Sequence, residues 1–349
     1  MTSISEIVET STPINLIKKK EIIKMTRLGL ESNYDRVYSW LILFDIYPSN
    51  SVEWPSKVHF INEKYFNLVD LFGLRGWEQS VIPKHFEKQD FHVNDPETMS
   101  IIHSDILRTS RLLFFLPKCT NSRAGEKDPS DILCFIQEHL RRIERILYIN
   151  SLLNDGIGYL QGYNELVSPF YILLAKTIDL WNDNLDFVES LCFNMFSYLM
   201  KKGDIKEFFT QDKSSQGTDK IFHFKELQMK HLPAVADIIN TLNIHPMYYC
   251  MRWFSLLFSQ EYDLPDLLLV WDCLFSHLDE ISEYSFYIGL GQLKVIEPKL
   301  SKKDYGKTLS NLQNLNIGSS LSKVINYANQ FWCDDHKGFF TKYFSWLGF

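Results

Sequence analysis

The residues that decide the fold run from position 131 to position 153 and read DILCFIQEHLRRIERILYINSLL. Apolar side chains recur in this stretch every three or four residues, which is the spacing of one face of an α-helix. The stretch therefore predicts one long helix that packs its apolar face into a core. Asn154 and Gly156 follow it and predict its end, because both residue types readily take the left-handed conformation after a helix. Three arginines lie largely off the apolar stripe: Arg141, Arg142 and Arg145.

Helical spacing continues on both sides of this stretch, whereas alternating runs typical of strands are scarce. Asp95, Pro96 and Glu97 indicate another helix start, since they place a capping residue, a first-turn proline and an acid at the positive end of the helix dipole. That helix is expected to run toward Arg108. We therefore predict an all-α protein, with further helices near residues 185–201, 218–229, 232–241, 248–258 and 265–276, and with loops at 120–130 and 210–217.

The composition is that of a folded, weakly acidic chain. Hydrophobic residues make up 45% of its 349 residues, which excludes disorder throughout. The 36 basic and 43 acidic residues give a net charge of −7, so a broad basic face for nucleic acid is not expected. The length suits either two lobes or one large helical domain.

The sequence gives no sign of secretion or of a membrane span. Residues Met1–Ser11 lack the basic-then-apolar order of a signal peptide, and apolar runs stay far below the roughly 20 residues of a spanning helix. The six cysteines form no C-x-x-C pair, so we expect reduced and mostly buried thiols. These features predict a cytoplasmic protein.

The first polar segment of interest is Ile102-x-x-Asp105-x-x-Arg108. Residues three apart lie on nearly one face of a helix, so Asp105 can hold Arg108 while Ile102 anchors the segment in the core. An arginine held in this way projects a planar, permanently charged group that can bind an oxyanion. The same spacing is also common in ordinary surface ion pairs.

The second segment runs from Gly156 to Glu165 and reads GIGYLQGYNE. Its three glycines allow backbone geometry that other residues avoid, and Gln161 could point its amide outward, toward a water molecule. A plain turn between helices, with Gln161 as a local cap, is the alternative. No Gly-Lys-Ser/Thr follows, so the loop is not a nucleotide-binding P-loop.

The third segment, Arg252 to Asp272, is rich in aromatic residues and leucine and is assigned to architecture. Taken in this order, the three segments resemble the TBC domain of Rab GTPase-activating proteins. The motifs that carry the resemblance are Ile102-x-x-Asp105-x-x-Arg108, Tyr159-x-Gln161-Gly162 with Asn164-Glu165-Leu166, and Arg252-Trp253 to Asp272.

The resemblance implies a two-lobed helical domain that accelerates GTP hydrolysis by a Rab GTPase in its GTP-bound state, and so regulates vesicle trafficking. Arg108 would be the arginine finger and Gln161 the glutamine finger. GTP and Mg²⁺ would belong to the partner, with no cofactor or metal held by this chain. The residues that would support the catalytic loops are Asp105, Tyr159, Gly162 and Asn164.

The resemblance also implies boundaries. Residues 1–28 would be an N-terminal extension with a basic amphipathic helix, and residues 29–330 the TBC domain, with its lobes dividing at about residue 184 or in the loop at 210–217. Residues 331–349 would be an aromatic C-terminal segment, expected to pack. Two departures from the family pattern stand out: Gly29-Leu30-Glu31 lacks the usual proline, and Tyr163 replaces a frequent methionine, which bears on the fit of the GTPase.

Two other functions remain compatible with the same scaffold. The first is a catalytically silent module that binds a GTPase or tethers a membrane, although both finger residues are present here. The second is a membrane adaptor that acts through the basic helix at Lys18–Lys24, a segment more simply explained as a solvated helix face. An independent hydrolase is poorly supported, because neither H-E-x-x-H nor G-x-S-x-G occurs. Peripheral membrane association could come from the lipid anchor of the partner.

Overall fold

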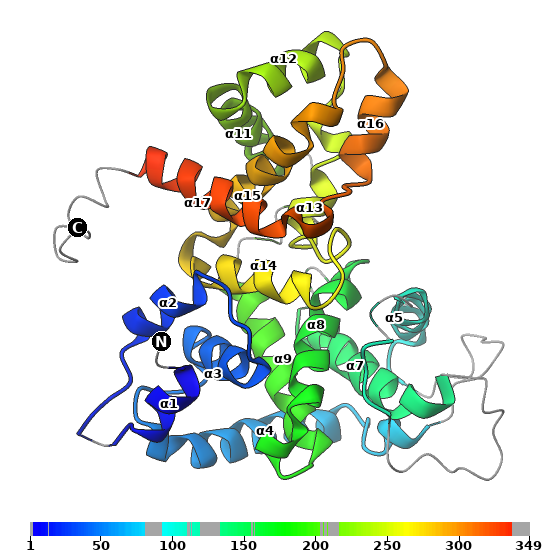
Figure 1. The fold of residues 1–349 in the computed structure, drawn as a ribbon. Coiled ribbons are helices and arrows are strands. Elements are labelled where there is room, and N and C mark those ends of the chain that lie inside the picture. Colours follow the sequence, from blue (N-terminus) through cyan, green and yellow to red (C-terminus); the bar gives the residue numbers. More distant parts are fainter. Residues whose placement is uncertain are drawn as a thin grey trace. The chain divides into compact units, whose positions relative to one another are not determined.

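The structure is a computed structural model, and it describes residues 3–12, 14–80, 93–109, 112, 114–118, 133–154, 156, 158–202, 205, 208 and 216–336. Throughout these residues the secondary structure is helical, without strands, as the spacing of apolar residues predicted (Figure 1). The chain divides into two compact units, Met1–Lys201 and Lys202–Phe349. Each has its own buried apolar core.

The first unit is built from α1 to α9. Its long helix α7 ends at Leu153, as the sequence predicted, and α5 begins directly after Asp95, whose side chain accepts a hydrogen bond of 3.0 Å from the backbone N–H of Thr98. The bounds in this unit are α1 Ile4–Glu9, α2 Lys19–Thr26, α3 Asn33–Leu43, α4 Trp54–Leu71, α5 Pro96–Arg108, α7 Leu133–Leu153, α8 Tyr163–Lys176 and α9 Leu185–Lys202.

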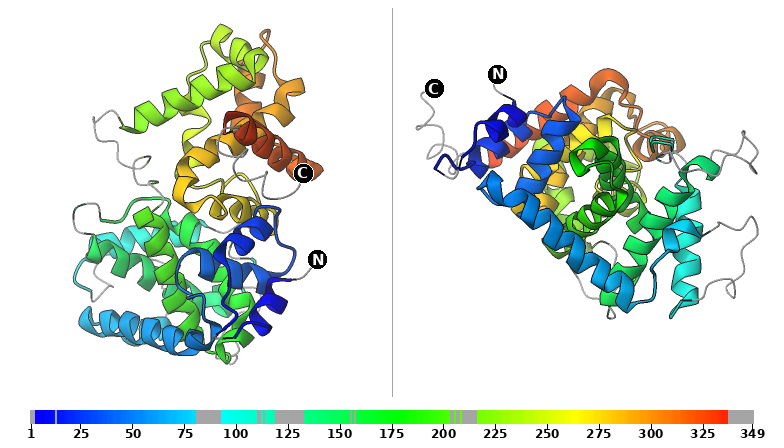
Figure 2. Two further views of the ribbon diagram at one scale, coloured as in Figure 1. Left: turned by 90° about the vertical axis from the view of Figure 1, so that its left-hand side faces the viewer. Right: turned by 90° about the horizontal axis from the view of Figure 1, so that it is seen from below.

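The N-terminal helices α1 and α2 both pack against α3 (Figure 2). Ile4 and Ile22 are fully buried, and Ile17 between the two helices is 4% exposed. The backbone N–H and the hydroxyl of Ser5 donate to the carboxylate of Asp35 at 2.8 and 2.5 Å. The segment that precedes residue 29 is thus part of the packing of the first unit.

The second unit is built from α11 to α17, with α15 and α17 side by side (Figures 1 and 2). Their backbones approach closely at Gly291, where a Cβ atom would lie 2.3 Å from the carbonyl oxygen of Val324. The bounds in this unit are α11 Gln216–His231, α12 Pro233–Thr241, α13 Met251–Ser255, α14 Asp266–Phe275, α15 Ile281–Ile296, α16 Tyr305–Gln313 and α17 Leu321–Asp335.

One predicted helix is shorter than the sequence suggested. Residues 248–258 were expected to be helical throughout, but α13 covers only Met251–Ser255. Leu257 and Phe258 take positive φ angles of 46° and 64°, which end the helix. Burial explains how such a conformation persists, because Leu257 and Phe258 are 1% and 0% exposed and pack into the core of the second unit.

The three off-stripe arginines of α7 form a buried ionic cluster in the first unit. Such positions of an amphipathic helix usually face solvent, yet Arg141, Arg142 and Arg145 are only 2%, 6% and 0% exposed. Arg145 binds Glu189 of α9 through two parallel contacts of 2.6 and 2.7 Å, and Arg142 reaches the same carboxylate at 2.7 Å. Arg141 pairs with Glu144 at 2.6 Å.

The arginines can be buried because acidic side chains of α7 and α9 compensate their charge. Burial alone would raise the pKa of Glu189, but Arg145, Arg142 and the hydroxyl of Tyr65 together offset this, so the pKa lies below its usual range. The cluster joins α7 to α9 through charge rather than through the apolar stripe.

Candidate functional site

The first part of the site is the C-terminal end of α5. Ile102 is fully buried and anchors this end, as the motif predicted. Asp105 also points inward and is 3% exposed, whereas the side chain of Arg108 is 64% exposed. Arg108 Nη2 donates to Asp105 Oδ1. The last turn of α5 therefore presents a guanidinium to solvent while a buried carboxylate holds it.

The second part is the loop that leads into α8. Gly158 and Gly162 take positive φ angles of 66° and 105°, in the region that glycine occupies most readily. Gly162 is the N-cap of α8, so the chain turns sharply just before the helix begins. Gln161, immediately before this turn, is exposed.

The two parts meet at Asp105. Gln161 Nε2 donates to Asp105 Oδ1 at 3.3 Å, the same oxygen that accepts from Arg108. The hydroxyl of Tyr159 donates to the other oxygen, Oδ2, at 2.9 Å. The structure thus brings together an exposed guanidinium and an exposed carboxamide from distant segments, and one buried carboxylate binds both.

Tyr159 keeps its proton in this site. Burial and the adjacent Asp105 carboxylate both raise the pKa of its phenol well above the usual range, because each disfavours the phenolate. At neutral pH the hydroxyl is therefore a hydrogen-bond donor to Asp105. The hydroxyl of Tyr159 also lies 3.4 Å from Asn164 Oδ1, so it contacts both α5 and α8.

A second set of hydrogen bonds, made by Asn164, connects the end of α5 to the start of α8. Asn164, in the first turn of α8, donates from Nδ2 to the carbonyl oxygen of Asp105 at 3.2 Å and to Thr109 Oγ1 at 2.5 Å. Sequence reasoning included Asn164 but missed Thr109. The signal available for Thr109 was its position directly after Arg108, where a hydroxyl can bond the last carbonyl groups of the helix.

Tyr163, the second departure from the family pattern, is an internal residue of the first unit. It is 2% exposed, and its ring packs edge-on against Tyr159 and Phe196 at centroid distances of 6.0 and 5.5 Å. A ring buried in this way is not part of the surface that a binding partner could contact. The replacement is accommodated inside the first unit.

The third segment is architectural, as predicted. Trp253 and Phe254 are fully buried in the second unit, and Trp271 Nε1 donates to the carbonyl oxygen of Leu257 at 2.8 Å. Arg252 remains at the surface and binds Glu261 at 2.6 Å. Nothing in this segment resembles a reactive site.

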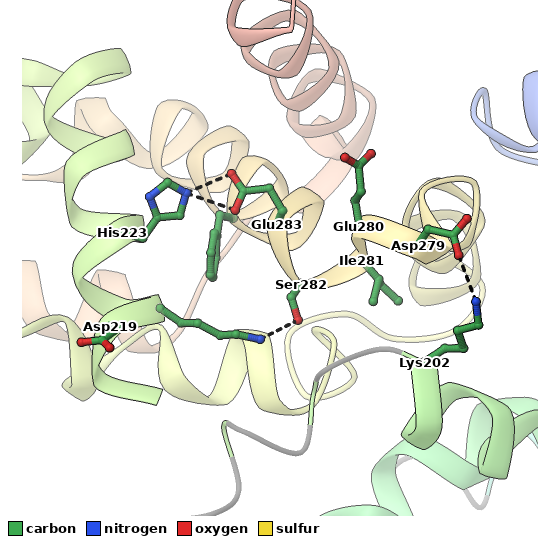
Figure 3. Close-up of a pocket in the computed structure, with 10 residues that line it drawn as sticks. Lys202, Asp219, His223, Asp279, Glu280, Ile281, Ser282 and Glu283 are labelled. Atoms are coloured by element: carbon green, nitrogen blue, oxygen red, sulfur yellow. Dashed lines mark hydrogen bonds and ion pairs between the residues drawn. The ribbon is translucent and has the colours of Figure 1, made fainter. Parts of the chain in front are cut away.

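A cavity of about 450 Å³ in the second unit contains none of the predicted site residues (Figure 3). Some of its charged residues pair within the cavity wall, for example His223 and Glu283, whose side chains lie 3.0 Å apart. Among the described residues, no group of His, Cys, Asp and Glu could hold a metal ion. Across the same part of the chain, no helix is long and apolar enough to cross a membrane.

The cysteines follow the expectation where the structure describes them. Cys192, Cys250 and Cys273 are buried, and Cys333 is half-buried. Burial raises the pKa of Cys192 and Cys250 well above the usual range, so these thiols are poor nucleophiles. The other two, Cys119 and Cys134, have side chains outside the described residues.

Comparison with known proteins identifies the family of this chain. The family model of the Rab-GTPase-TBC domain matches residues 78–301, a range that contains both halves of the Asp105 site. The chain belongs to this family. The resemblance carried by the three sequence segments is therefore confirmed.

Relatives within the TBC family are similar over part of their length. A TBC domain-containing protein of Schizosaccharomyces pombe is 36% identical over 138 residues, which cover 39% of this chain and 22% of that protein. Human TBC1 domain family member 13 is 30% identical over 199 residues, covering 56% of this chain and 48% of that protein. The chain thus spans about a fifth to a half of the length of these relatives.

The TBC fold itself agrees with a solved structure. The crystal structure of the Ypt/Rab-GAP domain of Gyp1p superposes with a TM-score of 0.70 and 16% sequence identity, covering 94% of this chain and 97% of that one. At this identity the likeness concerns the fold alone. It confirms the all-α class.

Proposed function

We propose that this TBC domain protein accelerates GTP hydrolysis by a Rab-type GTPase in its GTP-bound state, and that Arg108 and Gln161 are the residues it supplies. The observation that carries the proposal is their shared contact with Asp105 Oδ1 while both remain exposed. A relative supports it: the GTPase-activating protein GYP7 of Saccharomyces cerevisiae is 23% identical to this chain, with 70% of this chain and 33% of that protein covered.

The guanidinium of Arg108 would stabilise the transition state. Phosphoryl transfer spreads negative charge over the terminal phosphoryl group and the leaving oxygen, so a fixed cation lowers the barrier more than it stabilises bound GTP. An arginine finger generally accelerates hydrolysis by about 10³ to 10⁵, or roughly 4 to 7 kcal/mol of barrier. A side chain 64% exposed can leave its intramolecular partner to reach a phosphate.

The carboxamide of Gln161 would orient the attacking water, since an amide offers both a donor and an acceptor. This division of roles requires no general base from the chain. GTP and Mg²⁺ are expected on the partner GTPase. Asp105, Tyr159, Gly162 and Asn164 would keep the two side chains in register without touching phosphate.

The place of action follows from the partner. A Rab-type GTPase carries a lipid anchor, so a protein that binds it reaches a membrane surface without an anchor of its own. We therefore propose that the chain acts in the cytoplasm and peripherally on endomembranes, where it would regulate vesicle-mediated transport.

The test is GTP hydrolysis by a panel of purified Rab GTPases with the wild-type chain, Arg108→Lys and Gln161→Ala. Lysine keeps the charge of Arg108 but loses its planar fork, so we expect stimulation to fall by about 10²-fold or more in each variant. Arg75→Lys is the matched control, because Arg75 is also exposed and bound to one carboxylate, that of Asp70.

The outcomes separate the two functions that share this scaffold. If both variants stimulate hydrolysis as well as wild type, the residue roles are wrong. If wild type binds GTP-loaded Rab proteins and stimulates none of them, the protein is a silent binding module instead.

A further inference from the structure

Thr109 is the first residue beyond α5 and directly follows Arg108. It is 3% exposed. Its hydroxyl donates to the carbonyl oxygen of Asp105 at 2.9 Å, and the hydroxyl oxygen, Thr109 Oγ1, accepts from Asn164 Nδ2 at 2.5 Å. Thr109 is therefore bonded both to its own helix and to a residue of another helix.

Asn164 lies three positions after Gln161, in the first turn of α8. Its Nδ2 group spans the carbonyl oxygen of Asp105 and the hydroxyl of Thr109. These contacts fix the start of α8 against the end of α5. The end of α5 carries Arg108, and the start of α8 follows the loop that carries Gln161.

We propose that Thr109 is a positioning residue for this pair: its hydroxyl, through Asn164, sets the separation between Arg108 and Gln161. The inference rests on the proposed function for what the pair does. The separation itself is a structural property that can be measured in the isolated protein.

The position is suited to this role because the direct contacts of the two side chains are weak restraints. Both reach Asp105 from solvent-exposed positions, where side chains exchange rotamers readily. The contacts of Thr109 and Asn164 are buried and act on the backbone. A small shift of that backbone would misplace both reacting groups, and a misplacement of about 1 Å can lower a rate by about 10²-fold.

Thr109→Val and Thr109→Ser distinguish the hydroxyl from the shape of the side chain. Valine has nearly the shape of threonine without the hydroxyl, and serine keeps the hydroxyl without the methyl group. In the valine variant Asn164 Nδ2 still reaches the carbonyl oxygen of Asp105, so the buried amide keeps a partner. We therefore expect both variants to fold.

The matched control is Thr26→Val in the same unit. Thr26 is also fully buried near the end of a helix, and its hydroxyl contacts the carbonyl oxygen of Ile22 at 2.7 Å and the hydroxyl of Ser39 at 2.5 Å. It shares the loss of a buried hydroxyl with Thr109→Val, and it touches none of the proposed site residues. Thr26→Val therefore shows how the loss of a buried hydroxyl affects hydrolysis and amide exchange when the proposed site is left unchanged.

The first measurement is hydrolysis by a GTPase that the wild-type chain stimulates. We expect Thr109→Val to lower kcat by about tenfold while KM for the GTPase changes by less than about twofold, because positioning acts on the chemical step. Thr109→Ser should recover most of the wild-type kcat, and Thr26→Val should keep it. Equal values of kcat for Thr109→Val and Thr26→Val would overturn the inference.

The second measurement is amide hydrogen exchange of the free protein, which needs no GTPase. Thr109→Val should raise exchange severalfold at Gly158–Gly162, whereas Thr109→Ser and Thr26→Val should not. If wild type stimulates no GTPase, the proposed function fails, and the exchange of this loop then decides the inference alone. Unchanged exchange in Thr109→Val would refute it.

Discussion

His139 is a histidine of α7 that stays neutral inside the first unit. It is 2% exposed, and its Nδ1 lies 3.0 Å from the hydroxyl of Tyr171. Burial, together with the nearby charge of Arg142, lowers its pKa from 6.5 to about 4. In the unfolded chain the same imidazole titrates near its ordinary value.

This difference predicts a loss of stability in acid. Below pH 6.5 the unfolded chain binds a proton that the folded chain does not bind until about pH 4, so unfolding becomes more favourable as the pH falls through this window. The contribution is on the order of 3 kcal/mol, fully present above pH 6.5. Urea unfolding of wild type and His139→Gln at several pH values checks it.

The glutamine variant should show a smaller slope of unfolding free energy against pH between 6.5 and 4. His59→Gln, at an exposed position of α4, controls for the removal of a histidine. Identical slopes for wild type and His139→Gln would contradict the prediction.

At the same scale, the sequence could predict the contact between Asp105 and Arg108, because three residues along a helix fix their distance. It could not place Gln161 or Tyr159 on that carboxylate from spacing alone, since these contacts span more than fifty positions. Only the resemblance joined the two segments. The catalytic roles of Arg108 and Gln161 stay predictions until hydrolysis is measured.

At the scale of elements, helix periodicity predicted most of the helices but not their partners. The arginines of α7 carried no sign of burial, because Glu189, which compensates two of them, comes from α9. Likewise, nothing local marked the left-handed residues Leu257 and Phe258, which tertiary packing imposes. In both places long-range contacts override a local pattern.

The close approach of α15 and α17 at Gly291 gives a prediction. A Cβ atom at Gly291 would lie 2.3 Å from the carbonyl oxygen of Val324, a backbone atom that a rotamer change cannot move. We expect Gly291→Ala to lower the free energy of unfolding by about 1–3 kcal/mol, since α15 and α17 must separate. Chemical denaturation measures the change.

Gly306→Ala provides the control within the same unit. Gly306 lies in α16, where an added Cβ atom would meet only Asp304 Oδ1 at 3.8 Å. Alanine favours helix over glycine, so stability there should stay the same or rise slightly. Tolerance of alanine at both glycines would show that the helix contact is looser than described.

At the scale of the whole molecule, the N-terminal segment belongs to the packing of the first unit. Removal of residues 1–28 would uncover α3 where Ile4, Ile17 and Ile22 are buried. Full burial of such side chains stabilises by about 1.5–3 kcal/mol each, so we expect the midpoint of thermal unfolding to fall by more than about 5 °C. Calorimetry of the shortened chain tests this.

A graded truncation sharpens the experiment. Removal of residues 1–11 takes away α1, with Ile4 and the contact between Ser5 and Asp35, but leaves α2 in place. The fall should then be smaller than for removal of 1–28. An unchanged midpoint for both truncations would show that the segment adds nothing to the stability of the unit.

Boundaries were the least accessible property at this scale. Composition changes little along the chain, so the sequence offered two places for the lobe division, about residue 184 or the loop at 210–217, and the two compact units divide between Lys201 and Lys202. Where a unit ends depends on which helices contact each other, and helix periodicity carries no such information. The aromatic segment after Trp332 lies largely outside the described residues, although α17 buries Phe331 and Trp332.

Arg108 and Gln161 donate to the same oxygen of Asp105, and the electrostatic consequence of leaving it differs between the two side chains. If the carboxamide of Gln161 alone is drawn away, the guanidinium stays neutralised; if Arg108 leaves first, a shielded anion loses its only charged ligand among the contacts described. When Arg108 moves to a terminal phosphoryl group, its guanidinium exchanges one anionic partner, the Asp105 carboxylate, for another. For the proposed function, the carboxamide of Gln161 would therefore be able to turn toward a nucleotide first, whereas Arg108 would leave Asp105 only as a phosphate takes the place of the carboxylate.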